Sequence, residues 1–313
     1  MKYLFGPVPS RRLGLSLGID IIPFKTCTLD CIYCECGPTT HKTLERRSFV
    51  KKDDLIREIK FFLSQKPALD YITFSGSGEP LLNLDISWFI EKIKEMTSVP
   101  VAILTNGTLL ISDKVAESVM RSDLVIPSLD AATQAVFEKV NKPCKGLKIN
   151  KIISALAKFK KKFTGRLWLE ILFVKDINDS QREIEKLKKA VERIRPDRVQ
   201  LNTIDRPPAD KKARALPFNE LKQVKQFLSQ TGIPVDIIVR KGGVVYQKAS
   251  APLKLKSQIL GILKRRPETA AGLSKALGIR IVQINKILRA MEESFLILPE
   301  QVNKDIFYKI KKI

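Results

Sequence analysis

Three closely spaced cysteines could bind a metal cluster. Cys27, Cys31 and Cys34 have the spacing C-x3-C-x2-C and follow a short apolar stretch that is typical of a β-strand. Three thiolates on one loop can hold three irons of a [4Fe–4S] cubane and leave the fourth iron open to another ligand. A structural zinc site that uses Cys36 as a fourth thiolate is the alternative, and the cysteines alone do not exclude it.

Three short polar motifs follow later apolar stretches: Gly76-Ser77-Gly78-Glu79-Pro80, Thr105-Asn106-Gly107 and Ser128-Leu129-Asp130. Each has an ordinary interpretation by itself, as a strand-to-helix turn, a plain turn or a helix N-cap. However, each of them stands at the end of a predicted strand. Functional residues of parallel α/β folds gather at the carboxyl ends of the strands, so we expect the three motifs to belong to one site.

Strands and helices alternate along most of the chain. Short runs rich in apolar and β-branched residues predict strands at 15–23, 71–75, 99–104, 124–128, 168–174, 199–203 and 235–239. Amphipathic stretches between them predict helices at 52–65, 86–96, 113–120, 148–161, 181–194 and 219–230. This repetition predicts βαβ units and a parallel sheet, so the expected fold class is α/β, in the form of a partial (β/α)6 TIM-like barrel.

The pattern changes near residue 241. Gly242-Gly243 and the run from Ala249 to Pro252 predict a linker. Beyond it, expected helices at 257–264, 269–277 and 280–293 and a strand pair at 295–298 and 306–310 are typical of a winged helix-turn-helix. We therefore predict a barrel domain at 1–240, a linker at 241–252 and a small C-terminal winged-helix domain at 253–313.

The net charge of the chain favours an anionic partner. The 313 residues include 56 Lys and Arg against 33 Asp and Glu, a net charge of +23. A one-sided excess favours polyanions such as RNA, although charge spread over solvated faces is the alternative. In the predicted winged helix, residues 280–289 would form the recognition helix, with polar side chains on or near one face: Arg280, Gln283, Asn285, Lys286 and Arg289. Arg265 and Arg266 could reach phosphates, and a dimerisation or peptide-docking domain is the alternative.

Other features of the sequence indicate where in the cell we expect the protein to be. No apolar run reaches the roughly 18 residues that span a bilayer, and the first residues are broken too early by Pro7 to form a signal peptide. Four of the five cysteines lie within ten residues, which favours a metal or cluster in a reducing compartment over a disulfide framework. We expect a cytoplasmic protein with no membrane partner.

Together the motifs resemble the radical S-adenosylmethionine (SAM) superfamily over roughly residues 15–205. The resemblance implies a [4Fe–4S] cluster with Cys27, Cys31 and Cys34 as its ligands, SAM as the second cofactor, and an electron donor of ferredoxin or flavodoxin type. Tyr33 would lie beside the adenine, and the glycine motif would approach the methionine amino group. The residues that the resemblance assigns to SAM binding are Tyr33, Gly76, Gly78, Glu79, Thr105, Asn106, Ser128 and Asp130.

The resemblance also implies an activity. A reduced cluster would cleave SAM to methionine and a 5′-deoxyadenosyl radical, which would take a hydrogen atom from a substrate. The stretches 5–14, 127–131 and 140–143 resemble a branch grouped with wybutosine tRNA-modifying enzymes. Archaeal wybutosine synthases carry extra cysteines for a second cluster, and this chain has none before Cys27. It also lacks a recognisable form of their substrate lysine motif, so the resemblance carries the grouping and not wybutosine synthesis.

Several residues are weaker candidates. Polar residues near the fifth and sixth predicted strands of the barrel could face its cavity and bind substrate, or be buried for structural reasons: Glu170, Lys175, Gln200, Asn202 and Asp205. Cys144 is expected to be an ordinary cysteine, and His41, the one histidine, a solvent-exposed loop residue. The sequence identifies no catalytic residue that acts on the substrate.

Three hypotheses follow for the function. The first is a radical SAM enzyme that acts on RNA, with tRNA as the expected kind. The second is a radical SAM enzyme that modifies a protein, peptide or small molecule and uses its C-terminal domain for docking. The third is an iron–sulfur DNA-binding sensor without turnover.

Overall fold

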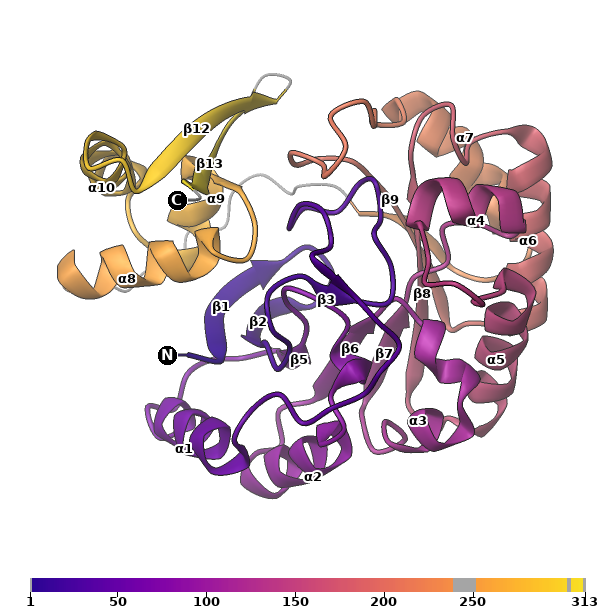
Figure 1. The fold of residues 1–313 in the computed structure, drawn as a ribbon, viewed down its shortest axis with the longest axis horizontal. Coiled ribbons are helices and arrows are strands. Elements are labelled where there is room, and N and C mark those ends of the chain that lie inside the picture. The colour runs from indigo at the N-terminus through magenta and orange to yellow at the C-terminus, as the bar shows by residue number, and fades with distance from the viewer. Residues whose placement is uncertain (1, 239–251, 303–304, 312–313) are drawn as a thin grey trace.

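The computed structural model describes residues 2–238, 252–302 and 305–311. Its largest element is an eight-stranded sheet in which β1 pairs antiparallel with β2 and all later neighbours are parallel (Figure 1). In sheet order the strands are β1 (Leu4–Ser10), β2 (Gly14–Ile19), β5 (Tyr71–Phe74), β6 (Val101–Thr105), β7 (Leu124–Pro127), β8 (Arg166–Phe173), β9 (Arg198–Thr203) and β10 (Val235–Ile237). The seven predicted strands are confirmed to within a few residues.

Helices form an outer layer around this sheet (Figure 1). They are α1 (Lys52–Leu63), α2 (Ile86–Met96), α3 (Asp113–Glu117), α4 (Gln134–Asn141), α5 (Ile149–Lys162), α6 (Gln181–Ile194) and α7 (Phe218–Ser229). Six were predicted. The sequence did not reveal the eight-residue α4, nor the short elements β1, β3 (Thr26–Cys27), β4 (His41–Lys42), η1 (Pro80–Leu82) and η2 (Thr108–Ile111). Six strand–helix units followed by β10 give the expected α/β class with a mostly parallel sheet.

Strand β8 shows how the sheet separates its two faces. Leu167, Leu169, Ile171 and Phe173 are fully buried in the large hydrophobic core that includes the helices. The residues that alternate with them are less buried, as the two-residue period of a strand requires: Arg166 is exposed, and Trp168, Glu170 and Leu172 are partly buried. The core therefore fixes the strand so that its polar residues are presented on the other face, where they can line a site.

The C-terminal segment (residues 252–311) has its own hydrophobic core, which includes Ile259, Leu273, Ile284 and Leu288. It contains α8 (Pro252–Leu263), β11 (Glu268–Thr269), α9 (Ala270–Leu277), α10 (Ile281–Glu293), β12 (Ile297–Val302) and β13 (Asp305–Ile310). The strands form a small sheet in the order β11-β13-β12. The predicted three helices and strand pair are confirmed as elements, whereas the predicted linker, apart from Pro252, lies outside the described residues.

The C-terminal segment packs against the start of the chain. Helices α8 and α9 contact β1, at the edge of the large sheet (Figure 1). This contact places the loop between α8 and α9 near the carboxyl ends of the parallel strands, where the candidate site lies. None of the helices in the described ranges is both long enough and apolar enough to cross a membrane.

Candidate functional site

The cysteine loop follows β2, as predicted. Cys27 ends β3, and the chain then turns so that the Cys34 amide donates to the carbonyl of Cys31. Each thiol sulfur lies near one nitrogen donor: Asn106 Nδ2 at 3.4 Å from Cys27, Asn141 Nδ2 at 3.3 Å from Cys31, and Lys25 Nζ at 3.1 Å from Cys34. N–H groups directed at sulfur stabilise thiolates and are a recurrent feature around iron–sulfur clusters.

The three thiols differ in how readily they ionise. A hydrogen bond with Cys36 and the positive charge of Lys25 lower the pKa of Cys34 to about 6, against the opposing effect of burial. Burial, with the charge of Glu79, raises the pKa of Cys27 to about 12. Burial also raises the pKa of Cys31. Cys34 is therefore the thiol of the three that ionises most readily, and the other two would lose their protons on binding a metal.

This donor set fits a cubane with three protein ligands. Three thiols come from one loop, and the groups around them supply N–H donors to sulfur. In the described part of the chain, no three His, Cys, Asp or Glu side chains are already gathered as a metal site, so the cysteines would have to turn inward to bind a cluster.

The glycine motif after β5 packs directly on the cysteine loop. A Cβ added to Gly78 would lie 2.0 Å from the carbonyl oxygen of Thr26, and one added to Gly76 would lie 2.3 Å from the carboxyl carbon of Asp20. Asp20 accepts hydrogen bonds from the amide and the hydroxyl of Ser77, at 3.2 and 2.6 Å. Glycine is thus required at position 78 for the close approach of two backbone segments and at position 76 for the close approach of the Asp20 carboxylate, in addition to the predicted approach to a ligand.

Glu79 joins this motif to the next one. Its buried carboxylate accepts from the Thr105 hydroxyl at 2.6 Å, from the Asn106 amide at 2.7 Å and from the Leu81 amide at 3.0 Å. Asn106 in turn donates to Thr28 at 2.8 Å and contacts Cys27. In this structure Glu79 and Thr105 support the loop that carries Asn106, and Asn106 is the member that reaches the cysteines.

Burial of Glu79 predicts a pH dependence of stability. Burial raises the pKa of its carboxyl from 4.5 to about 7, although three donors oppose the shift. Between these values the folded state binds a proton that the unfolded state has lost, so stability falls as pH rises through this window. We expect the free energy of unfolding to fall by roughly 2–4 kcal/mol more in the wild type than in Glu79→Gln between pH 4.5 and 8. Urea denaturation across this pH range measures it, and equal falls in both proteins would contradict the assignment.

Asp130, after β7, is the centre of a second buried network. One of its oxygens accepts from the Tyr33 hydroxyl and from Asn141 Nδ2 at 2.8 Å, and the other accepts from the Leu172 amide at 2.9 Å. Asn141 also donates to Cys31, so it connects Asp130 with a candidate cluster ligand. Burial raises the pKa of Asp130 to about 6. Ser128 lies on the same loop and donates its amide to the carbonyl of Thr105.

A cavity of about 320 Å³ opens beside these loops. Tyr33, Cys34 and Gly76 form one part of its wall. The turn between β1 and β2 adds Arg11 and Arg12, and the C-terminal segment adds Ile262, Arg265 and Arg266. The cavity therefore lies between the expected cofactor loops and the C-terminal segment.

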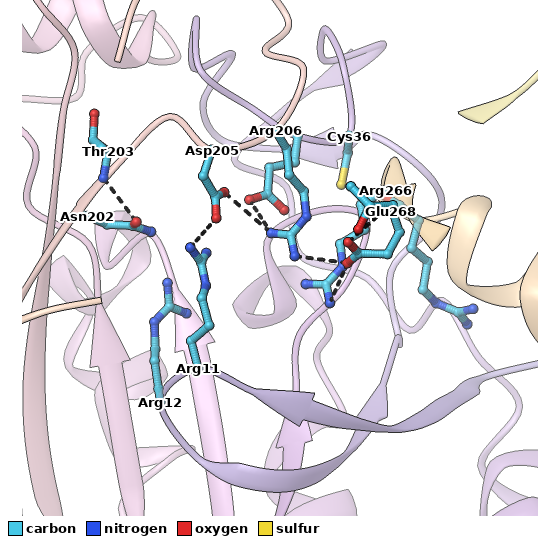
Figure 2. Close-up of polar contacts among 12 residues, drawn as sticks. Arg11, Arg12, Cys36, Asn202, Thr203, Asp205, Arg206, Arg266 and Glu268 are labelled. Atoms are coloured by element: carbon cyan, nitrogen blue, oxygen red, sulfur yellow. Dashed lines mark hydrogen bonds and ion pairs between the residues drawn. The ribbon is translucent and has the colours of Figure 1, made fainter. Parts of the chain in front are cut away.

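The weaker predicted residues separate into two groups. Glu170 and Asn202 line the cavity, where Asn202 donates to Glu170 at 3.1 Å and Arg12 pairs with the same carboxylate. Gln200 is buried opposite Glu170 in the pairing of β8 with β9, and its side-chain oxygen has no hydrogen-bond partner among the described residues. Asp205 binds Arg11 next to the cavity (Figure 2). Lys175 does not belong to this group, since it pairs with Glu220 and Asp179.

The remaining predicted residues have simpler surroundings. The Cys36 sulfur lies 2.8 Å from the carbonyl oxygen of Arg265, and Cys36 lines the cavity. Cys144 is partly buried, and its amide donates to the carbonyl of Thr28. His41 is exposed, as predicted, but in the short strand β4.

Sequence reasoning missed several residues of the site. Asn141 contacts both Asp130 and Cys31, Lys25 contacts Cys34, and Arg206 lies at the centre of an ion-pair network with Glu35 and Glu268 (Figure 2). Asn141 belongs to one of the stretches whose resemblance was noted, which was the available signal. Arg206 had none, because its role depends on a partner 62 residues away.

Known proteins are similar to this chain in sequence and in fold. A family model described as the Radical SAM superfamily matches residues 21–188. A UPF0026 protein of Helicobacter pylori is 35% identical over 274 residues, which are 86% of both chains. A protein named GTPase Obg from Brachyspira hyodysenteriae is 37% identical over 99% of this chain but only 45% of its own length. This chain has no G-x-x-x-x-G-K-[ST] phosphate-binding motif, and the name GTPase is that of the longer protein.

More distant relatives extend the likeness. A probable dual-specificity RNA methyltransferase RlmN from Thermotoga maritima is 26% identical over 74% of this chain and 66% of its own length. Among solved structures, a radical SAM methyltransferase from Sphaerobacter thermophilus has a TM-score of 0.52 at 16% identity, over 71% of this chain and 65% of that one. Streptococcus suis SuiB bound to S-adenosylmethionine has a TM-score of 0.54 at 16% identity, over 72% of this chain and half of that one. At this low sequence identity, the structural likeness establishes the fold alone.

Proposed function

This chain belongs to the Radical SAM superfamily, and on that premise we propose that it holds a [4Fe–4S] cluster on Cys27, Cys31 and Cys34 and cleaves SAM to start a radical reaction on a substrate. The observation that supports this most directly is the convergence of three strand-end motifs on one cysteine loop, with an N–H donor near each sulfur. When bound, the two cofactors would supply reductive cleavage of SAM and hydrogen-atom abstraction from the substrate by the 5′-deoxyadenosyl radical.

The chain's own residues would bind and orient these groups. Asn106, Asn141 and Lys25 would direct N–H groups at the three sulfurs. Asp130 holds the Tyr33 ring on the cavity wall through the phenol hydroxyl, which suits the expected contact with adenine. The glycine motif, fixed by Asp20 and Glu79, would present its backbone to the methionine part of SAM. Ser128 is proposed as a further contact from the same edge of the sheet.

The direct test is product formation. Anaerobically reconstituted protein, incubated with SAM and dithionite, should release 5′-deoxyadenosine and methionine, which chromatography with mass spectrometry detects. A protein that retains its cluster but forms no 5′-deoxyadenosine above the background without enzyme would contradict the proposal. Since the superfamily is a class of enzymes, a non-catalytic DNA-binding sensor is not proposed.

For the substrate we propose RNA, with tRNA as the first candidate. The proposal rests on the net charge of +23, on the named activity of the RlmN relative, and on a C-terminal segment that from residue 251 to 313 carries 13 Lys and Arg against five Asp and Glu. The three helices and the small sheet of that segment suit a winged helix-turn-helix. In this proposal α10 is the recognition helix and faces the nucleic acid. Arg280, Lys286 and Arg289 are exposed on or just before α10.

This proposal predicts where RNA binds. Replacing Arg280, Lys286 and Arg289 together by Gln should weaken binding to bulk tRNA by about 10-fold or more at 50 mM salt and reduce the slope of log K against log salt by up to about 3. Lys151, Lys161 and Lys162, which are exposed on α5, give a charge-matched control triple that should change affinity less. Filter binding across a salt series measures both. Loss of affinity equal in the two triples would indicate unspecific charge attraction and contradict the assignment.

A protein, peptide or small-molecule substrate is the second candidate. It is favoured by one observation, namely that Ile262, Arg265 and Arg266 of the C-terminal segment line the cavity themselves. In that position the C-terminal segment restricts the access of a substrate to the cavity from its own side. Pull-down of a peptide partner that survives nuclease treatment would favour this candidate over RNA.

A further inference from the structure

The cavity beside the cysteine loop is rich in hydrogen-bond donors. Four arginines that line it form what we call the arginine cluster: Arg11, Arg12, Arg206 and Arg266. They come from the β1–β2 turn, the loop after β9 and the loop after α8. Arg265 also lines the cavity, but its guanidinium stacks on Phe5 and lies beside Asp20, so it is not counted in the cluster.

Charge within the cluster is nearly balanced. Arg11 pairs with Asp205, and Arg12 pairs with Glu170. Arg206 binds Glu35 at 2.8 Å and Glu268 at 3.0 Å. Figure 2 shows Arg206 and Arg266 pointing at the same carboxylate, Glu268, which lies 3.8 Å from Arg266.

The hydrogen-bond donors of the arginine cluster outnumber the acceptors that they contact. A guanidinium carries five N–H groups. Arg11 and Arg12 each donate one side-chain hydrogen bond, Arg206 donates two, and Arg266 donates none within the described residues. Two of the remaining donors are buried, Nε of Arg12 and Nε of Arg206, and the Arg206 side chain is only 7% exposed. A buried donor without an acceptor is costly, so these groups favour a ligand with many acceptor oxygens.

Arg266 has the surroundings of a ligand-binding cation. Its side chain is one-third exposed, at the side of the cavity formed by the C-terminal segment. The nearby positive charge of Arg206, together with burial, lowers the pKa of Arg266. Relief of this repulsion by an anion would be favourable.

We propose that the arginine cluster binds an oxyanion of the substrate, a carboxylate or a phosphate, at the end of the cavity formed by the C-terminal segment. Arg266 and Arg206 would be the main ligands, since guanidinium forks match two oxygens of either group. A cavity of about 320 Å³ is at the small end of ligand pockets, so the group enters as part of a small molecule or as one unit of a larger chain. The inference rests on the proposed function for the identity of the site, and it adds the class of ligand.

Anion binding tests the inference on the full-length, anaerobically reconstituted protein. Inorganic phosphate and, in a separate arm, acetate are titrated calorimetrically at constant ionic strength. We expect at least one of them to bind, and Arg266→Gln to weaken that binding at least 10-fold. Arg182→Gln removes the same charge from an exposed position on α6, outside the cavity, and should change affinity less than two-fold. Arg266→Lys should recover only part of the loss, because it keeps the charge but not the fork.

Three results would overturn the inference. The first is the absence of both phosphate and acetate binding. The second is equal binding by Arg266→Gln and Arg182→Gln when both retain the circular dichroism of the wild type. The third is displacement of SAM by the bound anion, which would place the oxyanion site in the cofactor's own site. Failure of the proposed function has a different signature, since wild-type protein would then form no 5′-deoxyadenosine whatever its affinity for anions.

Discussion

Cys34→Ala is expected to lose its iron and to form 5′-deoxyadenosine at least about 100-fold more slowly than wild type, because changes to outer partners of metal ligands alone typically cost 10–100-fold. Cys34 is the thiol whose pKa is lowered, to about 6, by its hydrogen bond with Cys36 and by Lys25. The same loss is expected for Cys27→Ala and Cys31→Ala. Iron content, the visible absorption of the cluster and product formation after anaerobic reconstitution measure the effect.

Two other cysteines provide controls for this prediction. Cys144→Ala changes a partly buried thiol on a different loop and should retain both iron and product formation. Cys36→Ala should retain its iron, since a cubane with three protein ligands does not need Cys36, whereas a zinc site of four thiolates would. Loss of bound metal in Cys36→Ala, or retention of the cluster in Cys34→Ala, would be incompatible with the proposed ligand set.

Asp130→Ala is expected to lower the free energy of unfolding by about 3–5 kcal/mol, because three donors lose their acceptor in a buried site. The donors are the Tyr33 hydroxyl, Asn141 Nδ2 and the Leu172 amide. The variant should also bind SAM more weakly, since Tyr33 and Asn141 would no longer be fixed beside the cysteine loop. Urea denaturation and equilibrium dialysis with labelled SAM measure the two effects.

Asp113→Ala provides the comparison for Asp130→Ala. The Asp113 carboxylate is 63% exposed and pairs with Lys158 on the surface. Exposed pairs contribute little, so we expect a loss below about 1 kcal/mol and no change in SAM binding. A similar small loss in Asp130→Ala would show that the buried network does not hold Tyr33 and Asn141 as described.

Much of the fold followed from local patterns. The seven strands are short runs rich in apolar and β-branched residues, and six of the outer helices have an amphipathic period, because both kinds of element bury apolar side chains in a common core. Helix α4 was missed because its eight residues include only three buried ones, too few for a recognisable period. The strand β1 was missed for another reason, since it is an antiparallel edge strand whose Pro7 and Pro9 do not suggest a strand.

The candidate site was predictable only in part. The cysteine motif and the motifs near Gly76, Asn106 and Asp130 are short, and each follows the end of a strand. Their convergence could therefore be predicted from the topology of a parallel sheet. The contact of Glu79 with SAM stays a prediction, and what the sequence did not indicate is that its carboxylate accepts hydrogen bonds from Thr105 and Asn106. The arginine cluster could not be predicted, because its members are spread from residue 11 to residue 266, and Arg266 joins the others only through the packing of the C-terminal segment on β1.

The central claim is that three cysteines leave one corner of a cubane free for SAM. Electron paramagnetic resonance of the reduced, anaerobically reconstituted protein tests it most directly, with and without SAM. The proposed site predicts a cluster signal whose shape changes when SAM is added and remains unchanged with adenosine alone. A protein that takes up zinc in place of iron, or a cluster signal that is identical with and without SAM, would contradict it.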